Sequence, residues 1–375
     1  MKRILAINPG STSTKIAVFH DIHEQLAQTV GHASEELQQF TRLIDQLPLR
    51  MEAVRSFLDV QELAVRDFDA FVGRGGLLRP IPGGTYLVSP VMVHDLRICK
   101  YGTHASNLGA LIADQLAAES CCPAFIVDPV VVDELEPIAR ITGRPDIEKR
   151  SIFHALNQKA VAKRFALMVG SRYEDLTLIV AHLGGGISIG CHRKGFVVDV
   201  NNALDGSGPF SPERAGTIQA GKWTELLLQK DTSLSDALKM ISGRGGLVAH
   251  LGTSNVLDVE QKIKEGDEHA RLIYDAMIYG ISREIGAAAV AAEGQVDGII
   301  LTGGIAHSQY VTGRIEKYVR FIGPVHVMAG ENEMMALAEG AWRVLCGHEV
   351  AREYSDSVPP VCYEPCELEI LSISH

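Results

Sequence analysis

Three segments rich in glycine and small polar residues are the parts of this chain whose residue types could do chemistry. They lie at residues 8–14, 182–186 and 302–304, each directly after or at the end of an apolar run. Glycine lets another group approach the backbone closely, and successive backbone amides in a turn can hold an anion. Three such turns in this order suggest one nucleotide held between two halves of the protein, with its phosphates at the first two turns and its adenosine at the third. A single turn of this kind is also compatible with an ordinary loop.

The first of these turns lies within the stretch ILAINPGSTSTKIAVF. Ile16, Val18 and Phe19 are β-branched or aromatic, which favours a strand after the turn rather than a helix. The P-loop signature needs a glycine directly before its Lys-Ser or Lys-Thr pair, whereas Thr14 precedes Lys15 here. The dinucleotide fingerprint needs three spaced glycines that open a helix, and it fails as well. What remains is a hairpin that either holds an anion or is an ordinary polar loop.

Composition limits the class of protein. The 375 residues exceed the roughly 250–300 at which single cores stop growing, so we expect two domains. A net charge of −11 and the absence of a basic stripe argue against nucleic acid as a partner. No apolar run approaches the roughly 20 residues that span a bilayer, and the apolar start is interrupted at Asn8-Pro9, unlike a signal peptide. Seven scattered cysteines fit a reduced compartment, so we expect a soluble cytoplasmic protein.

The second glycine-rich segment repeats the outline of the first. In TLIVAHLGGGISIGCHRKGFVVDV, residues 177–200, apolar strands flank a run of three glycines. This similarity suggests a duplicated domain, and chance similarity of two hairpins is the alternative. The third segment ends an apolar strand within residues 296–308. Helical patterns are predicted at residues 105–119, 151–168 with Ser151 as N-cap, 267–293 and 310–320. The pattern as a whole predicts an α/β protein.

These residues resemble the acetate kinase family, within the superfamily of acetate and sugar kinases, heat-shock chaperones and actin. INPGSTSTKIAVF is similar to the family's first phosphate motif, HLGGGISI to its second and ILTGGI to its adenosine motif. Five further segments match in the family's order: GRGG at 73–76, THASNLGALI at 103–112, FHALNQ at 153–158, SPERAGTI at 211–218 and ENEMMALAEGA at 331–341. In detail the pattern is closest to the butyrate kinases, including the branched-chain fatty acid kinases. The resemblance implies two ribonuclease-H-like domains of the actin-like ATPase type, residues 1–175 and 176–375, with the active-site cleft between them.

The resemblance also implies roles for individual residues. Arg74 would bind the substrate carboxylate, for which its planar fork is suited. Arg214, His154 and His182 would act at the transferring phosphoryl group. Asp128 corresponds to the family's active-site aspartate, but Pro-Val-Val-Val follows it where acetate kinases have Thr-Ala-Phe-His, so its role stays open. The residues implied at ATP are Asn8, Gly10, Ser11, Thr12, Ser13, Lys15, Gly184, Gly185, Gly186, Gly303 and Gly304.

Two further positions concern the metal and the acyl chain. Glu333 most nearly matches the family's magnesium-positioning glutamate, with Glu331 as the alternative in register. Beside Arg74 the chain has Gly75 and Gly76, where acetate kinases carry two valines. The missing side chains predict space for extra methylenes, each worth about 0.8 kcal/mol when buried. We therefore assign both glycines to substrate binding and expect butyrate or isobutyrate to be preferred over acetate.

The predicted function is an ATP- and Mg²⁺-dependent carboxylate kinase that forms an acyl phosphate and ADP reversibly, by direct in-line transfer. Alternatives are an acetate or propionate kinase, a sugar-type kinase, or a nucleotide-switch protein like the chaperones and actin. A sugar kinase needs a base to deprotonate a hydroxyl and has little use for Arg74, whereas a carboxylate is already ionised. The predicted partners are therefore a small carboxylate and a nucleotide. The resemblance implies a homo-oligomer, a dimer or larger.

Overall fold

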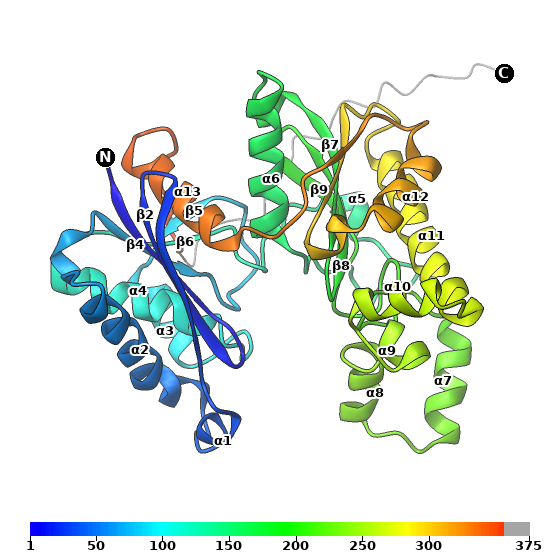
Figure 1. The fold of residues 1–375 in the computed structure, drawn as a ribbon, viewed down its shortest axis with the longest axis horizontal. Helices are drawn as coiled ribbons and strands as arrows, with labels where there is room; N and C mark the ends of the chain where they lie inside the picture. Colours follow the sequence, from blue (N-terminus) through cyan, green and yellow to red (C-terminus); the bar gives the residue numbers. More distant parts are fainter. Residues whose placement is uncertain (356–375) are drawn as a thin grey trace.

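The chain forms two β-sheets with helices on their faces, as the computed structural model of residues 1–355 shows (Figure 1). The first sheet has the order β3-β2-β1-β4-β6-β5 and the second has the order β11-β10-β7-β8-β9. The strands of the first sheet are β1 (Arg3–Pro9), β2 (Ser13–His20), β3 (His23–Gly31), β4 (Ala70–Arg74), β5 (Thr85–Leu87) and β6 (Ala124–Val127). Those of the second are β7 (Thr177–Leu183), β8 (Ile187–Arg193), β9 (Phe196–Val200), β10 (Gly298–Thr302) and β11 (Val325–Val327).

The two sheets share one topology. In each, the first three strands form an antiparallel meander, and a parallel strand then pairs with the first strand on its other side: β4 with β1, and β10 with β7. A further parallel strand follows in each sheet, β6 or β11. The first sheet adds the short antiparallel strand β5 at its edge. This repetition confirms the predicted α/β fold of two duplicated ribonuclease-H-like units.

Helices cover both faces of each sheet. The α-helices within residues 1–355 are α1 (Ser34–Leu37), α2 (Leu47–Val60), α3 (Pro90–Arg97), α4 (Asn107–Ser120), α5 (Pro137–Arg140), α6 (Ala155–Met168), α7 (Ala220–Gln229), α8 (Leu234–Ile241), α9 (Gly246–Leu251), α10 (Val256–Lys264), α11 (Glu268–Ala291), α12 (Gln309–Val319) and α13 (Glu333–Leu345). None of the helices within residues 1–355 is both long enough and apolar enough to cross a membrane.

Alternation along the central strands explains why both faces need cover. In β1, Leu5 and Ile7 belong to the core shared with α2 and α4, whereas Ile4 and Ala6 belong to the core shared with α13. Successive strand residues point to opposite faces, so one short apolar strand supplies two cores. In the second sheet, α11 packs on one face and α6 on the other. Both cores depend on Ala, Val, Ile and Leu, in keeping with the composition.

Two helices cross the predicted domain division at residue 175. Helix α6 precedes that division but packs on β7 and β10 of the second sheet, while α13 follows it but packs on β1, β4 and β6 of the first. Figure 1 shows α6 and α13 lying between the two sheets. The division into residues 1–175 and 176–375 therefore stays a prediction, and residues 356–375 lie outside the described part of the chain.

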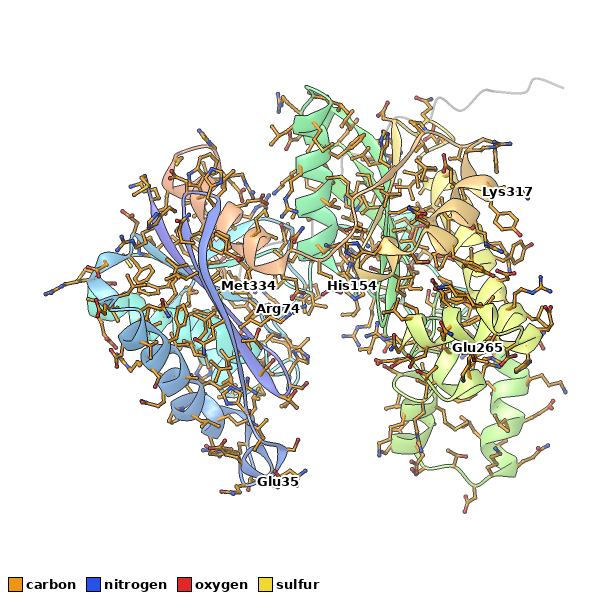
Figure 2. All side chains as sticks on the ribbon, viewed as in Figure 1. Glu35, Arg74, His154, Glu265, Lys317 and Met334 are labelled. Carbon is orange, nitrogen blue, oxygen red and sulfur yellow. The ribbon has the colours of Figure 1, made fainter. Side chains whose placement is uncertain are left out.

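The predicted N-cap of α6 is wrong. The helix begins at Ala155, and Ser151 lies four residues earlier with its hydroxyl donating to Val132 O at 2.8 Å. His154 occupies the cap position instead. This shift matters because it places His154 at the end of the helix that faces the first sheet, as Figure 2 shows.

Candidate active site

The carboxyl ends of β1 and β4 bring Asn8 and Arg74 together with Glu333, the first residue of α13. Arg74 Nη1 lies 2.9 Å from Glu333 Oε1, and Asn8 Nδ2 donates to Glu333 Oε2 at 2.7 Å. Parallel neighbouring strands end at the same edge of a sheet, which is why residues so far apart in sequence meet here. In Figure 2, Arg74 and Met334, the neighbour of Glu333, lie at the edge of the first half and His154 faces them.

Two stacked histidines form the opposite wall. The rings of His154 and His182 lie 3.8 Å apart between centroids, with an angle of 12° between their planes. Burial, and then the charges of Arg74 and Arg214, lower the pKa of His182 to about 3. Burial holds the pKa of His154 well below its usual value as well, and His182 and the same two arginines lower it further. Both rings are therefore neutral near pH 7, and each must carry its proton on one particular nitrogen.

A buried hydrogen-bond chain assigns the proton of His154 to Nε2. The hydroxyl of Ser188 accepts from Gln158 Nε2 at 2.8 Å and from the backbone N–H of His154 at 3.3 Å, which occupies both of its lone pairs. Its own hydrogen is then directed to His154 Nδ1, at 2.8 Å. The Gln158 amide is oriented by donating to the carbonyl oxygen of Ser188 at 3.0 Å, while its own oxygen accepts from His192. His154 Nε2–H is thus a hydrogen-bond donor.

His182 has the opposite tautomer. Asn157 Nδ2 donates to Glu331 O at 2.9 Å, which fixes the orientation of the amide and turns its oxygen toward His182. His182 Nδ1 lies 2.8 Å from that oxygen and therefore carries the hydrogen. Its Nε2 is left as an acceptor, 3.7 Å from Glu331 Oε1. The stacked pair consequently presents one donor, from His154, and one acceptor, from His182.

Arg214 reaches this wall because residue 186 is glycine. Its guanidinium donates to Ala203 O and lies against Gly186, where an added Cβ would be 1.8 Å from Arg214 Nη1. Burial lowers the pKa of Arg214, and Glu213 opposes that shift. Arg214 still stays charged, since the ordinary arginine pKa lies far above 7. The turn at Gly184–Gly186 is held from the same loop, since Ser211 Oγ donates to Gly185 O at 2.6 Å.

The third glycine turn packs directly on the second. Gly303 has φ +88°, and an added Cβ would lie 2.4 Å from the carbonyl oxygen of Leu183. Gly303 and Gly330 exchange backbone hydrogen bonds of 3.1 and 3.0 Å. This bridge holds the segment that carries Glu331 beside the strand end that carries His182. Gly304, by contrast, would gain a Cβ with no atom within 4 Å, so the space beside it is open.

The first glycine turn is a tight hairpin, as predicted. Gly10 N donates to Ser13 O at 2.7 Å, and β1 pairs with β2 up to Pro9 and Thr14. Ser11 and Thr12 are exposed at its tip. Lys15 is exposed as well, and its charge lowers the pKa of Glu331 against the larger effects of burial and Glu333.

Arg50 of α2 supports this hairpin from behind and was missed in the sequence. It is fully buried, and its guanidinium donates to Ser13 O at 2.9 Å and to Ser11 O at 3.2 Å. The arginine thereby fixes the carbonyl groups of Ser11 and Ser13 on its own side of the turn. The N–H groups between them then point away from Arg50. Nothing around Arg50 in the sequence signals this role, because the contact depends on how α2 packs beside β2.

The structure ties Asp128 to the backbone rather than to the histidines. Its carboxylate accepts from Gly84 N at 2.6 Å, and its own N–H donates to Gly84 O at 3.0 Å. Asp128 has φ +36°, a conformation that these two bonds hold in place. The predicted catalytic role of Asp128 stays untested, and its contacts are those of a turn-stabilising residue.

The geometric reason given for Gly75 and Gly76 is wrong. An added Cβ at Gly75 would lie 2.6 Å from Pro129 Cβ, and one at Gly76 would lie 2.4 Å from Asn107 Oδ1. Both glycines therefore allow close packing against the protein, rather than leaving space for an acyl chain. Sequence alone does not reveal the direction in which a missing side chain would point. Their assignment to substrate binding stays a prediction without this argument.

Two carboxylates, Glu331 beside His182 and Glu333 beside Arg74, suit a divalent cation that also contacts phosphates. Burial and the neighbouring charge of Glu333 raise the pKa of Glu331, whereas Glu333 is already paired with Arg74. A cation between them would relieve this repulsion. Within residues 1–355 no group of three or more His, Cys, Asp or Glu forms a metal cage. Mg²⁺ needs none, because it is usually held by one or two carboxylates, waters and substrate phosphates.

Two sheets of one topology, with glycine-rich turns at strand ends and two arginines near a stacked pair of histidines, suit a nucleotide-dependent phosphotransferase. The chain belongs to the acetokinase family, whose model matches residues 147–338. Butyrate kinase 2 of Clostridium acetobutylicum is 50% identical over 352 residues, 94% of this chain and 99% of that protein. Butyrate kinase 1 of the same species is 49% identical over 354 residues, 94% of this chain and 100% of that protein. The chain is therefore a kinase, as predicted.

Solved structures of the family share the fold. The acetate kinase of Porphyromonas gingivalis superimposes with a TM-score of 0.74 at 18% identity, covering 91% of this chain and 99% of that one. A propionate kinase from Francisella tularensis subsp. tularensis gives 0.71 at 17% identity, covering 90% and 99%. At these identities the similarity concerns the arrangement of the two sheets and their helices.

Proposed function

We propose that the protein is a butyrate kinase-type enzyme, which transfers the γ-phosphoryl group of ATP to a short-chain carboxylate, butyrate or a branched analogue, and releases an acyl phosphate and ADP. The observation that carries this proposal is about 50% identity to two butyrate kinases over 94% of the chain. The facing arrangement of Arg74 and the His154–His182 pair supports it, because the reaction brings a carboxylate and a phosphoryl group together. The reverse reaction would use the same groups.

Arg74 would bind the substrate carboxylate. Its contacts with Glu333 and Asn8 use Nη1, which leaves Nε and Nη2 without a hydrogen bond or ion pair within residues 1–355. An arginine presents five N–H donors in a planar fork, so one edge can hold Glu333 while the other binds a carboxylate. The pairing with Glu333 would also keep the fork in a fixed orientation.

Arg214 and His154 would stabilise the transferring phosphoryl group. Phosphoryl transfer passes through a loose transition state, so positioning and charge stabilisation are the main tasks of the protein. Arg214 supplies a buried positive charge, and His154 supplies the neutral Nε2–H donor assigned above. His182 Nε2 would accept a hydrogen bond, for example from a water molecule. No base is needed, because the carboxylate is already ionised.

The nucleotide would lie along the three glycine turns. The hairpin with Asn8, Gly10 and Lys15 and the turn at Gly184–Gly186 would hold the phosphates, and the open space beside Gly304 would admit the adenosine. Mg²⁺ would neutralise phosphate charge, held by Glu331 and Glu333 directly or through water. We further propose that the enzyme acts in the cytoplasm as a homo-oligomer, a dimer or larger.

The acyl chain is tested by trapping the product as a hydroxamate. Purified enzyme, ATP, Mg²⁺ and hydroxylamine are incubated with acetate, propionate, butyrate, isobutyrate or isovalerate. A maximal kcat/KM at four or five carbons is expected. Apolar pockets discriminate by roughly 10 to 200-fold per methylene, so neighbouring chain lengths will react more slowly rather than fail. A maximum at acetate or propionate would instead support an acetate or propionate kinase, and hydroxamate with none of the acids would refute a carboxylate substrate.

A further inference from the structure

A cavity lies against α6, where Lys159, Lys163, Ala166 and Leu167 contribute to its lining. It has a volume of about 720 Å³ and is bounded by α6, the β8–β9 turn and the segment that follows α13. Ligand pockets commonly measure roughly 300–1,000 Å³. None of the residues assigned above to ATP, carboxylate or metal binding lines this cavity. It is therefore distinct from the candidate active site.

The wall of the cavity is strongly positive, although the whole chain carries a net charge of −11. Its lining includes six cationic side chains, Lys159, Lys163, Arg172, Lys194, Arg343 and Arg352, and three carboxylates, Glu134, Glu174 and Glu349. The Lys159 ammonium is neutralised by both oxygens of Glu134, at 2.9 and 2.8 Å. The remaining cations outnumber the remaining carboxylates, so the cavity attracts anions.

Lys163 is a cation of this wall that no carboxylate approaches within hydrogen-bond distance among residues 1–355. Its ammonium lies 4.0 Å from Glu349 Oε2, beyond hydrogen-bond distance. Glu349 is engaged more closely by others, since it accepts from Arg343 Nε and from Thr85 N, each at 2.8 Å. Although burial would raise it, the pKa of Glu349 is lowered to about 2 by Lys163, Arg343 and these hydrogen bonds. Burial lowers the pKa of Lys163, and Arg343 and Lys159 lower it further against Asp128 and Glu349.

The cavity also has an apolar wall. Ala166 and Leu167 of α6, Phe196 of β9 and the segment Val350-Ala351 contribute to its lining. Cations on one part of a concave surface and apolar groups on another fit a ligand that has both characters. We propose that this cavity binds a small phosphorylated molecule with an apolar or ring-shaped part, at a site separate from the ATP site.

An occupant of this site would contact elements that belong to different sheets. Lys163 lies in α6 and Lys194 in the β8–β9 turn, and both elements belong to the second sheet and its helices. Arg343 lies in α13, which packs on the first sheet, and Arg352 forms a β-bridge with Tyr86 of that sheet. A bound anion would favour one relative arrangement of these elements. Binding there and binding in the cleft would then influence each other reciprocally.

The test is calorimetric titration of phenyl phosphate, a dianion attached to a ring. The full-length enzyme is first saturated with Mg²⁺ and a non-hydrolysable ATP analogue, which fills the phosphate sites of the cleft. Saturable binding is expected in wild type, with about tenfold weaker affinity in Lys163→Met/Lys194→Met, as loss of about 1.4 kcal/mol of interaction would give. Lys194→Met is also measured alone, because Lys194 lies in the turn between β8 and β9 and its substitution should leave the fold intact.

The matched control removes the same charge elsewhere. Lys230→Met/Lys264→Met changes two exposed lysines that do not line the cavity, and its affinity for phenyl phosphate should stay within about twofold of wild type. Phenol, which lacks the phosphate, should bind at least tenfold more weakly than phenyl phosphate. Equal weakening by both double variants would show non-specific charge attraction and overturn the proposal. Absence of saturable binding to the wild type, or unchanged affinity in Lys163→Met/Lys194→Met and in Lys194→Met, would overturn it as well.

Discussion

Arg214 packs so closely against Gly186 that a methyl group added at this glycine should displace the guanidinium and slow catalysis. In Gly186→Ala, the new Cβ would lie 1.8 Å from Arg214 Nη1 and 2.4 Å from Cζ. Ordinary contact requires about 3.5 Å, so the guanidinium must move by about 1.7 Å. A misplacement of this size at a group that stabilises the transition state costs about 100-fold in kcat, or about 2.7 kcal/mol. Because the displaced atoms are the end of a flexible side chain, the fold should survive.

The assay is the steady-state formation of acyl hydroxamate from butyrate, with thermal unfolding measured in parallel. The free energy of unfolding should fall by no more than the about 1.5–3 kcal/mol of the Arg214 bond to Ala203 O. Gly313→Ala is the control, since its added Cβ would meet no atom within 4 Å. A folded Gly186→Ala enzyme with kcat within about threefold of wild type would refute the role given to Arg214.

Three further predictions follow from the buried network and the glycine turns. Ser188→Ala removes the hydroxyl hydrogen that Nδ1 of His154 accepts. We expect kcat to fall about tenfold with little change in KM, and ¹⁵N NMR to show a changed tautomer of His154. An unchanged spectrum would contradict the tautomer assigned to His154. Burial, and then the charge of Lys159, lowers the pKa of His192 well below 6.5 in the folded protein. As the pH drops below 6.5, His192 therefore takes up a proton in the unfolded chain but stays neutral in the folded one. The free energy of unfolding should therefore decrease below about pH 6.5, by up to about 1.4 kcal/mol per pH unit for each such histidine, and His192→Gln should flatten this slope in urea titrations. Gly303→Ala should destabilise the protein by about 1–3 kcal/mol, whereas Gly304→Ala should leave the thermal unfolding temperature almost unchanged. Equal effects of the two substitutions would contradict the packing described for the third turn.

Local patterns in the sequence predicted the fold and the glycine-rich turns that follow β1, β7 and β10. Alternating apolar strands around small-residue turns are visible in a single sequence, and duplication of the pattern gave the two sheets. Family motifs then indicated Arg74, Arg214 and the two histidines, which the structure brings close together.

What the sequence could not predict depends on tertiary direction. The glycines beside Arg74 suggested open space, but only the packed α4 and Pro129 show that this space is filled. The chain from His192 through Gln158 and Ser188 to His154 joins a helix to a strand, and no spacing rule links such residues. The role of Arg50 could not be predicted from the sequence either, because its partners are backbone carbonyls of a distant hairpin.

The most direct test of the central claim is the rate of butyryl hydroxamate formation with ATP and Mg²⁺ in wild type, Arg74→Ala and Arg97→Ala, the last being an exposed arginine of α3. We expect robust product in wild type and Arg97→Ala, and a kcat/KM for butyrate at least about 100-fold lower in Arg74→Ala, as loss of a charged bidentate contact of about 3 kcal/mol gives. Wild-type enzyme that binds ATP but forms no butyryl hydroxamate, or an Arg74→Ala variant as active as Arg97→Ala, would contradict it.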